Sequence, residues 1–126
     1  MIYGIGTDIV DVGRMRRNLD RYGERFAARI LTTVELEDYR RSIKPAHFLA
    51  RRFAAKEAAA KALGTGFGDG VGWREIGVVH DSRGKPQLAF DGRAAALMRN
   101  NRITGVHLSL ADEESHAVAF VALEID

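Results

Sequence analysis

Residues 53–64 read FAAKEAAAKALG, and six of these twelve residues are alanine, which has the highest helix propensity of all residues. The stretch predicts the second half of a helix that begins near Pro45, a residue favoured in the first helical turn, and runs to Leu63. Gly64 is the expected residue that ends it. Because alanine sustains a helix without help from charges, the charged residues of the stretch need a separate explanation.

The three charged residues of this stretch, Lys56, Glu57 and Lys61, do not all lie on a solvated face. On a helical wheel Lys56 falls within the apolar stripe that includes Leu49 and Leu63, and Glu57 lies at the edge of that stripe. In a structural interpretation, Glu57 and Lys61 form an i,i+4 ion pair, and Lys56 extends its ammonium group past the core to water. In a functional one, the Glu57 carboxylate binds a cation, and Mg²⁺ would be a stronger one than a lysine.

A second carboxylate favours the functional interpretation. Residues 2–10, IYGIGTDIV, predict a β-strand in which glycines permit close backbone approach and Asp8 lies near the end. Asp8 could simply be a turn or capping residue. An aspartate at a strand end and a glutamate on a helix are, however, a usual pair of ligands for Mg²⁺, which binds one or two carboxylates together with waters and substrate phosphates. Asp8 and Glu57 are therefore the predicted metal ligands.

The remaining patterns predict one domain, residues 1–126, of the α+β class. Helices are expected after Asp11 and Thr32 and from about 92 to 100 after Asp91, and Glu35 is interpreted as the capping-box partner of Thr32 rather than as a catalytic residue. Strands are expected near residues 73–80, 86–90, 103–111 and 116–125. Helices followed by neighbouring strands are typical of helices packed on a mainly antiparallel sheet.

Composition and charge limit the class of protein. The chain has 126 residues, 46% of them hydrophobic, and no cysteine, which excludes disulfides and thiolate sites. Its first residues do not resemble a signal peptide and no segment is long enough for a transmembrane helix, so we expect a cytoplasmic protein with no membrane partner. Residues 11–61 hold thirteen basic and seven acidic residues, a bias that suggests an acidic partner.

Four arginines recur at helical spacing after the first strand: Arg14, Arg17, Arg21 and Arg25. They are either the solvated side of an amphipathic helix, which Gly23 could divide in two, or a docking surface. A nucleic-acid partner is disfavoured, because Tyr22 and Phe26 are expected to face the core and leave no platform on which bases could stack. An interaction module without catalysis is disfavoured by the two carboxylates and Lys61.

Two motifs resemble a known family. GIGTDIVDVGRM (residues 4–15) and FAAKEAAAKALGTG (residues 53–66) resemble the two signatures of holo-[acyl-carrier-protein] synthase, the small bacterial type of 4′-phosphopantetheinyl transferase. The resemblance extends over nearly the whole chain, including RFAARILTTVE, DSRGKPQL and HLSLAD. It implies the family's fold, a homotrimer with sites between subunits, and transfer of 4′-phosphopantetheine from coenzyme A to a serine of apo-acyl carrier protein. Adenosine 3′,5′-bisphosphate would be released, and Mg²⁺ would be required.

The resemblance also assigns roles to individual residues. It implies that Asp8 and Glu57 bind the metal, that Lys61 contacts the phosphate next to pantetheine, and that His107 lies in a strand lining the coenzyme site. Gly64 and the glycines after it either bring backbone N–H groups to phosphate or only form a helix cap and loop. The arginines would dock the acidic helix of the carrier, away from phosphoryl transfer. The general base stays open among Glu57, Asp8 acting through a bound water, and another carboxylate.

Overall fold

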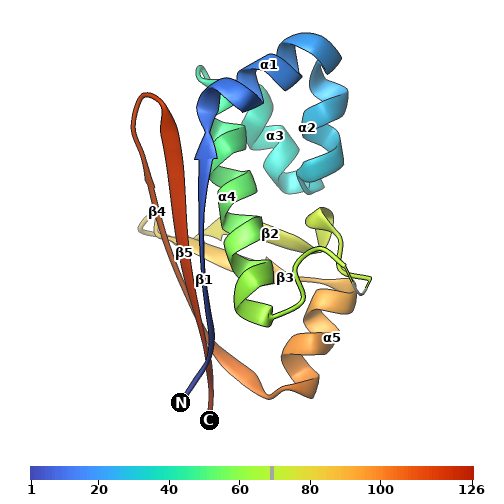
Figure 1. Cartoon of the computed structure of the whole chain (residues 1–126), viewed down its shortest axis with the longest axis vertical. Helices are drawn as coiled ribbons and strands as arrows, with labels where there is room; N and C mark the ends of the chain where they lie inside the picture. The colour runs from blue at the N-terminus through green and yellow to red at the C-terminus, as the bar shows by residue number, and fades with distance from the viewer. Residues whose placement is uncertain (69) are drawn as a thin grey trace.

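The structure is a computed structural model that describes residues 1–68 and 70–126 (Figure 1). Its strands are β1 (Ile2–Asp11), β2 (Ile76–His80), β3 (Pro86–Phe90), β4 (Ile103–Asp112) and β5 (His116–Ile125). Its α-helices are α1 (Val12–Tyr22), α2 (Glu24–Ile30), α3 (Thr33–Arg41), α4 (Pro45–Leu63) and α5 (Gly92–Asn100). A short 3₁₀ turn, η1 (Trp73–Glu75), precedes β2. One position of the glycine-rich stretch at 64–72, residue 69, lies outside the described residues.

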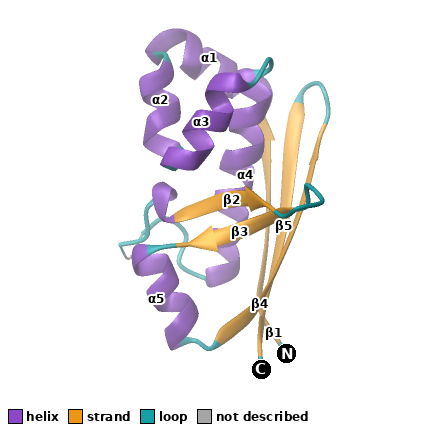
Figure 2. Cartoon of the chain, turned by 180° about the vertical axis from the view of Figure 1, so that it is seen from behind, coloured by secondary structure: helices purple, strands orange, loops and turns teal. Residues whose placement is uncertain are grey.

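The strands form two antiparallel units on either side of the longest helix. Strands β1, β5 and β4 pair in that order into a sheet, and β2 pairs with β3 as a hairpin. Helix α4 lies between them, and from behind the hairpin is seen to cross it (Figure 2). Helices α1, α2 and α3 gather at one end of the molecule and α5 at the other (Figure 1). The predicted α+β class with an antiparallel sheet is confirmed.

Close contact between α4 and β1 forms the centre of the core. Fourteen of the 19 residues of α4 are buried. A Cβ atom at Gly6 would overlap the backbone carbonyl oxygen of Ala58, and one at Gly4 would overlap that of Ala62. Glycine on the strand and alanine on the helix therefore let the two backbones approach more closely than larger side chains permit.

The ends of the helices follow the local sequence signals. The side chain of Asp11 accepts a hydrogen bond from the N–H of Gly13 and begins α1, and Thr32 and Glu35 form the predicted capping box of α3. Gly23 separates α1 from α2, and Gly64 ends α4 with a left-handed φ of 85°. The strand expected from residue 73 starts later, at Ile76, because the residues before it form the 3₁₀ turn.

The two faces of the three-stranded sheet differ in what covers them. Buried side chains such as Ala117, Ala119 and Val121 face α4. On the opposite face, large apolar side chains of β1 and β5 are exposed: Ile5 by 61%, Ile9 by 65%, Val118 by 39% and Phe120 by 46%. The pairing of β1 with β5 sets Ile9 opposite Val118, so these two side chains are neighbours on this face, and exposed apolar patches of large area are typical of interaction sites. Among the described residues, no helix combines the length and apolarity needed to cross a membrane.

The close approach of α4 to β1 predicts that Gly6→Ala strongly destabilises the fold. The added methyl group meets backbone atoms of α4, which cannot move aside as a flexible side chain can, so we expect a loss of about 3 kcal/mol in the free energy of unfolding. Gly72→Ala is the matched control, because nothing lies within 4 Å of its Cβ position. Urea unfolding of both variants checks this, and equal midpoints for the two would contradict close packing at Gly6.

Candidate active site

Asp8 and Lys61 form an ion pair between β1 and α4. Alternation along β1 turns Asp8 toward α4, where its side chain is 17% exposed. The Nζ of Lys61 lies 3.0 Å from Oδ1 of Asp8 and donates a second hydrogen bond, also 3.0 Å, to the carbonyl oxygen of Thr7. The alternative pairing of Lys61 with Glu57 along the helix is wrong, because the aspartate of the neighbouring strand accepts from Lys61 instead.

Glu57 lies beside this pair and is half-buried. Burial raises the pKa of Glu57, and the negative charge of Asp8 raises it further. Glu57 precedes Lys61 by four residues, so its side chain lies on the face of α4 where Lys61 meets Asp8. The side chain of Trp73 and the charges of Lys61 and Arg14 oppose this rise in the pKa. The structure thus brings together the two carboxylates and the lysine that the sequence singled out, one from a strand and two from a helix.

The donor set of this site suits a cation that takes only part of its ligands from protein. Within the described residues, no cluster of three or more histidine, aspartate or glutamate side chains could enclose a metal ion. Two carboxylates repel each other here, and a divalent cation between them would relieve the repulsion. Mg²⁺ is bound by one or two carboxylates together with waters and substrate phosphates, so Asp8 and Glu57 fit it.

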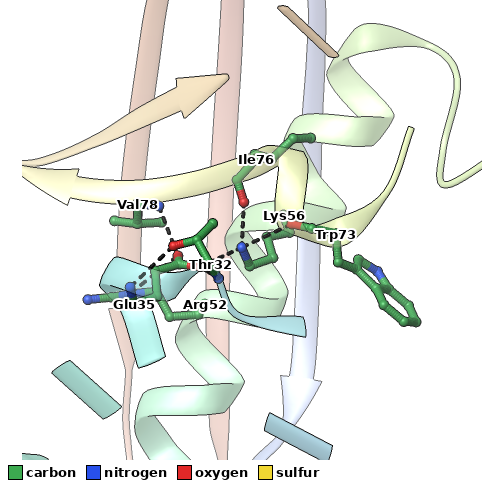
Figure 3. Close-up of polar contacts among 7 residues, drawn as sticks. All are labelled: Thr32, Glu35, Arg52, Lys56, Trp73, Ile76 and Val78. Carbon is green, nitrogen blue, oxygen red and sulfur yellow. Dashed lines mark hydrogen bonds and ion pairs between the residues drawn. The ribbon is translucent and has the colours of Figure 1, made fainter. Parts of the chain in front are cut away.

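Lys56 does not reach water, contrary to the structural interpretation of its position. It is fully buried, and its Nζ donates to Oε1 of Glu35 at 2.6 Å, to the carbonyl oxygen of Trp73 at 3.1 Å and to that of Ile76 (Figure 3). Burial lowers the pKa of Lys56, and Glu35 opposes this shift. The three acceptors match the three N–H groups of an ammonium, so the hydrogen bonds of its charged form are satisfied in this position.

Glu35 links the helices to the hairpin as well as capping α3. Its Oε1 accepts from the backbone N–H of Thr32 at 2.9 Å, and its Oε2 accepts from that of Val78 at 2.9 Å (Figure 3). The capping role is confirmed. The ion pair with Lys56 was not predicted, because it joins residues 21 positions apart, and the capping-box motif that contains Glu35 gives no signal for a partner so distant in the sequence.

His107 lies on the other face of the sheet from Asp8. It is paired in register with Ala122, whereas Asp8 is paired with Ala119, and successive side chains of a strand alternate between faces. Its Nε2 contacts the carboxylate of Glu124. Within one chain, His107 and the Asp8–Glu57 site are therefore separated by the sheet.

The first three N–H groups after α4 donate hydrogen bonds within the chain. Those of Gly64, Thr65 and Gly66 all bond to the carbonyl oxygen of Ala60, and that of Gly64 also bonds to Lys61. A helix C-terminus carries partial negative charge, which does not attract phosphate. Of the two interpretations of this stretch, the geometry favours the helix cap, and the role of Gly64 in coenzyme binding stays a prediction.

The predicted arginine stripe is divided between two helices. Arg14, Arg17 and Arg21 lie on α1 and Arg25 on α2, and all four are exposed. Arg14 was expected to lie away from the chemistry, but its guanidinium lies 5.7 Å from the ring centroid of Phe53 and its charge acts on Glu57.

Tyr22 was expected in the core and is instead 47% exposed. Helix α1 ends at this residue, so the apolar face does not continue over it. The guanidinium of Arg21 lies 5.3 Å from the centroid of its ring. Phe26, by contrast, packs partly buried against the core as expected.

The sequence model of the 4′-phosphopantetheinyl transferase superfamily matches residues 4–121. The chain belongs to this superfamily. A holo-[acyl-carrier-protein] synthase of Halorhodospira halophila is 58% identical over 123 residues, which cover 98% of each chain. The resemblance found in the two motifs is thus confirmed over the full length of the transferase domain.

Solved structures of similar transferases share this fold. The holo-[acyl-carrier-protein] synthase of Neisseria meningitidis superimposes with a TM-score of 0.92 at 47% identity, covering 98% of this chain and 99% of that one. The holo-(acyl-carrier-protein) synthase of Bacillus anthracis, in complex with CoA (3′,5′-ADP), gives a TM-score of 0.83 at 39% identity, with coverage of 100% and 99%.

Proposed function

We propose that this chain transfers the 4′-phosphopantetheine group of coenzyme A to a serine of apo-acyl carrier protein, with Mg²⁺ bound by Asp8 and Glu57. The observation that carries the proposal is the meeting of these two carboxylates with Lys61 between β1 and α4, in a chain of this superfamily. The name of the Halorhodospira relative and the coenzyme bound to the Bacillus protein support the substrate and the reaction.

The reaction needs positioning and charge stabilisation more than covalent chemistry from the protein. A serine hydroxyl of the carrier attacks the β-phosphorus of coenzyme A and gives up its proton to a general base. The bond from this phosphorus to the bridging oxygen breaks, and adenosine 3′,5′-bisphosphate leaves. Mg²⁺, when bound, supplies positive charge for the phosphoryl oxygens. Lys61 adds a second positive charge on the pantetheine side. Asp8 can accept from Lys61 and still bind metal, because an ionised carboxylate has about four lone-pair sites.

Asp8→Asn and Glu57→Gln are expected to lower the rate of transfer by about 10²-fold or more, because each removes a charge that holds the cation. Glu37→Gln is the matched control, since it makes the same change on an exposed residue of α3. Mass spectrometry of apo-carrier incubated with coenzyme A and Mg²⁺ measures the added arm. If both variants transferred the arm as fast as the parent at limiting Mg²⁺, Asp8 and Glu57 would not be the metal ligands.

We further propose that the working unit is a homotrimer in which the apolar outer face of the sheet is covered. This face carries exposed Ile5, Ile9, Val118 and Phe120, and His107 lies on it as well. A neighbouring subunit on this face would bring its own coenzyme close to His107, which cannot reach the site of its own chain. That the assembly contains three subunits is inferred from the family resemblance alone.

Shared sites predict that mixed assemblies recover activity. Glu57→Gln and His107→Ala chains, each inactive or impaired alone, complement each other if one site takes Glu57 from one subunit and His107 from the next. Activity after subunit exchange is measured by carrier mass spectrometry, with exchange followed by native mass spectrometry. Verified exchange without recovery, or a fully active monomer in sedimentation equilibrium, would contradict the shared site.

The exposed arginines of α1 and α2 are proposed to dock the acidic carrier. Exposed ion pairs contribute only about 0.2–1 kcal/mol each, so a charge reversal is more informative than a truncation. Because Arg14 lies next to the site, the test uses Arg17 and Arg21.

Arg17→Glu/Arg21→Glu is expected to raise the KM for the carrier and to leave the KM for coenzyme A near that of the parent. Added salt should raise the carrier KM of the parent more than that of the variant, because screening removes an attraction that the variant lacks. Arg99→Glu on α5, at the other end of the molecule, is the control. If the variant had the same carrier KM and the same salt dependence as the parent, the arginines would form only a solvated helix face and would not dock the carrier.

A further inference from the structure

The imidazole ring of His107 has one hydrogen-bond partner among the described residues, and that partner is the carboxylate of Glu124. Nε2 of His107 lies 2.5 Å from Oε1 of Glu124. The two residues are not opposite each other in the sheet, because His107 pairs with Ala122 and Glu124 pairs with Gly105. The Glu124 side chain therefore reaches diagonally from β5 to β4, between neighbours on one face of the sheet.

The glycine opposite Glu124 leaves the space that this diagonal contact needs. A Cβ atom at Gly105 would lie 3.0 Å from Cβ of Glu124 and 3.1 Å from its Oε1. Both distances are shorter than ordinary van der Waals contacts, so a side chain at Gly105 would displace the carboxylate. The φ of Gly105 is not left-handed, so no such backbone conformation requires glycine there. The missing side chain lets Glu124 lie over β4 and reach His107.

The contact determines which nitrogen of the ring is left for a ligand. An ionised carboxylate only accepts hydrogen bonds, so the proton between the two groups is assigned to Nε2 of His107. Nδ1 has no hydrogen-bond partner among the residues that the structure describes. The His107 side chain is 60% exposed, and packing alone does not hold so exposed a ring in one orientation. The hydrogen bond to Glu124 therefore fixes the ring and presents Nδ1 for a further contact.

We propose that Glu124 is a positioning residue for His107: it holds the imidazole ring so that Nδ1 contacts coenzyme A bound by the neighbouring subunit. This inference rests on the proposed shared site, in which His107 meets the coenzyme of a neighbour. Gly105 belongs to the same arrangement, because it makes room for the carboxylate. The alternative is a solvated ion pair that contributes nothing to coenzyme binding, and the experiment below distinguishes the two.

Substitutions at Glu124 separate positioning from packing. Glu124→Leu removes the acceptor and keeps most of the volume, whereas Glu124→Gln keeps a carbonyl oxygen that accepts from Nε2 and is the matched control. Each change is made in the parent and in the His107→Ala variant. Isothermal titration calorimetry with coenzyme A and Mg²⁺ measures the Kd for coenzyme A without requiring an active variant. It is run at protein concentrations at which sedimentation equilibrium shows the assembled state.

Glu124→Leu is expected to raise the Kd for coenzyme A about fivefold, and Glu124→Gln by less than about twofold. In the His107→Ala background Glu124→Leu should raise the Kd no further, because a residue that acts through His107 then has nothing to position. An equal increase in both backgrounds would overturn the inference. Equal effects of Glu124→Leu and Glu124→Gln would overturn it as well.

The outcomes also distinguish this inference from the function on which it rests. If His107→Ala weakens coenzyme A binding and Glu124→Leu does not, the positioning role is wrong and the shared site stands. If His107→Ala leaves the Kd at the parent value, His107 does not contact the coenzyme, and the shared site fails together with the inference.

Gly105→Ala tests the same contact without changing either partner. The added methyl group should displace the Glu124 carboxylate and raise the Kd for coenzyme A, as Glu124→Leu does. Combined with Glu124→Leu it should add nothing, because the carboxylate that it displaces is already gone. A Kd equal to the parent's in Gly105→Ala, or a further increase in the combined variant, would overturn the inference.

Discussion

The close approach of α4 to β1 at Gly6 is the constraint on which the rest of the structure depends. Two residues further along β1 lies Asp8, and the helix places Glu57 and Lys61 within reach of it. A larger residue at Gly6 would push the helix outward and separate the charges that the strand and the helix contribute. The small residues of the core and the charged residues of the site are thus parts of one arrangement, which explains why glycine accompanies Asp8 in the first motif and alanine accompanies Glu57 and Lys61 in the second.

The buried ion pair of Lys56 and Glu35 costs desolvation free energy, but it also holds several elements of the fold together. Replacing a buried pair by apolar residues of similar volume is often neutral or stabilising, so stability alone does not account for it. Its bonds, however, join α3, α4, η1 and β2 at one point and satisfy the carbonyl oxygens of Trp73 and Ile76. Apolar side chains could fill this space. They could not hold the η1 turn in one orientation, because they make no directional hydrogen bonds to its backbone.

Local signals gave most of what could be predicted from the sequence. The ends of helices were predicted from residues that act within a few positions of their own place in the sequence. These residues are Asp11, the capping pair of Thr32 and Glu35, and Gly64. The direction of Lys56 was predicted wrongly because its acceptors come from segments that lie far along the chain. The exposure of Tyr22 was missed for a related reason, since it depends on where α1 ends and not on helical spacing alone.

The separation of Asp8 from His107 follows from strand register, which the sequence did not provide. Alternation assigns each residue to a face of its own strand, but the faces of β1 and β4 are related only through their pairing with β5. The pairing leaves one face of the sheet covered by α4 and the other apolar and exposed. Under the proposed assembly, covering that face both buries this surface and joins the two halves of the site. Activity would then depend on protomer concentration in the same way as assembly does.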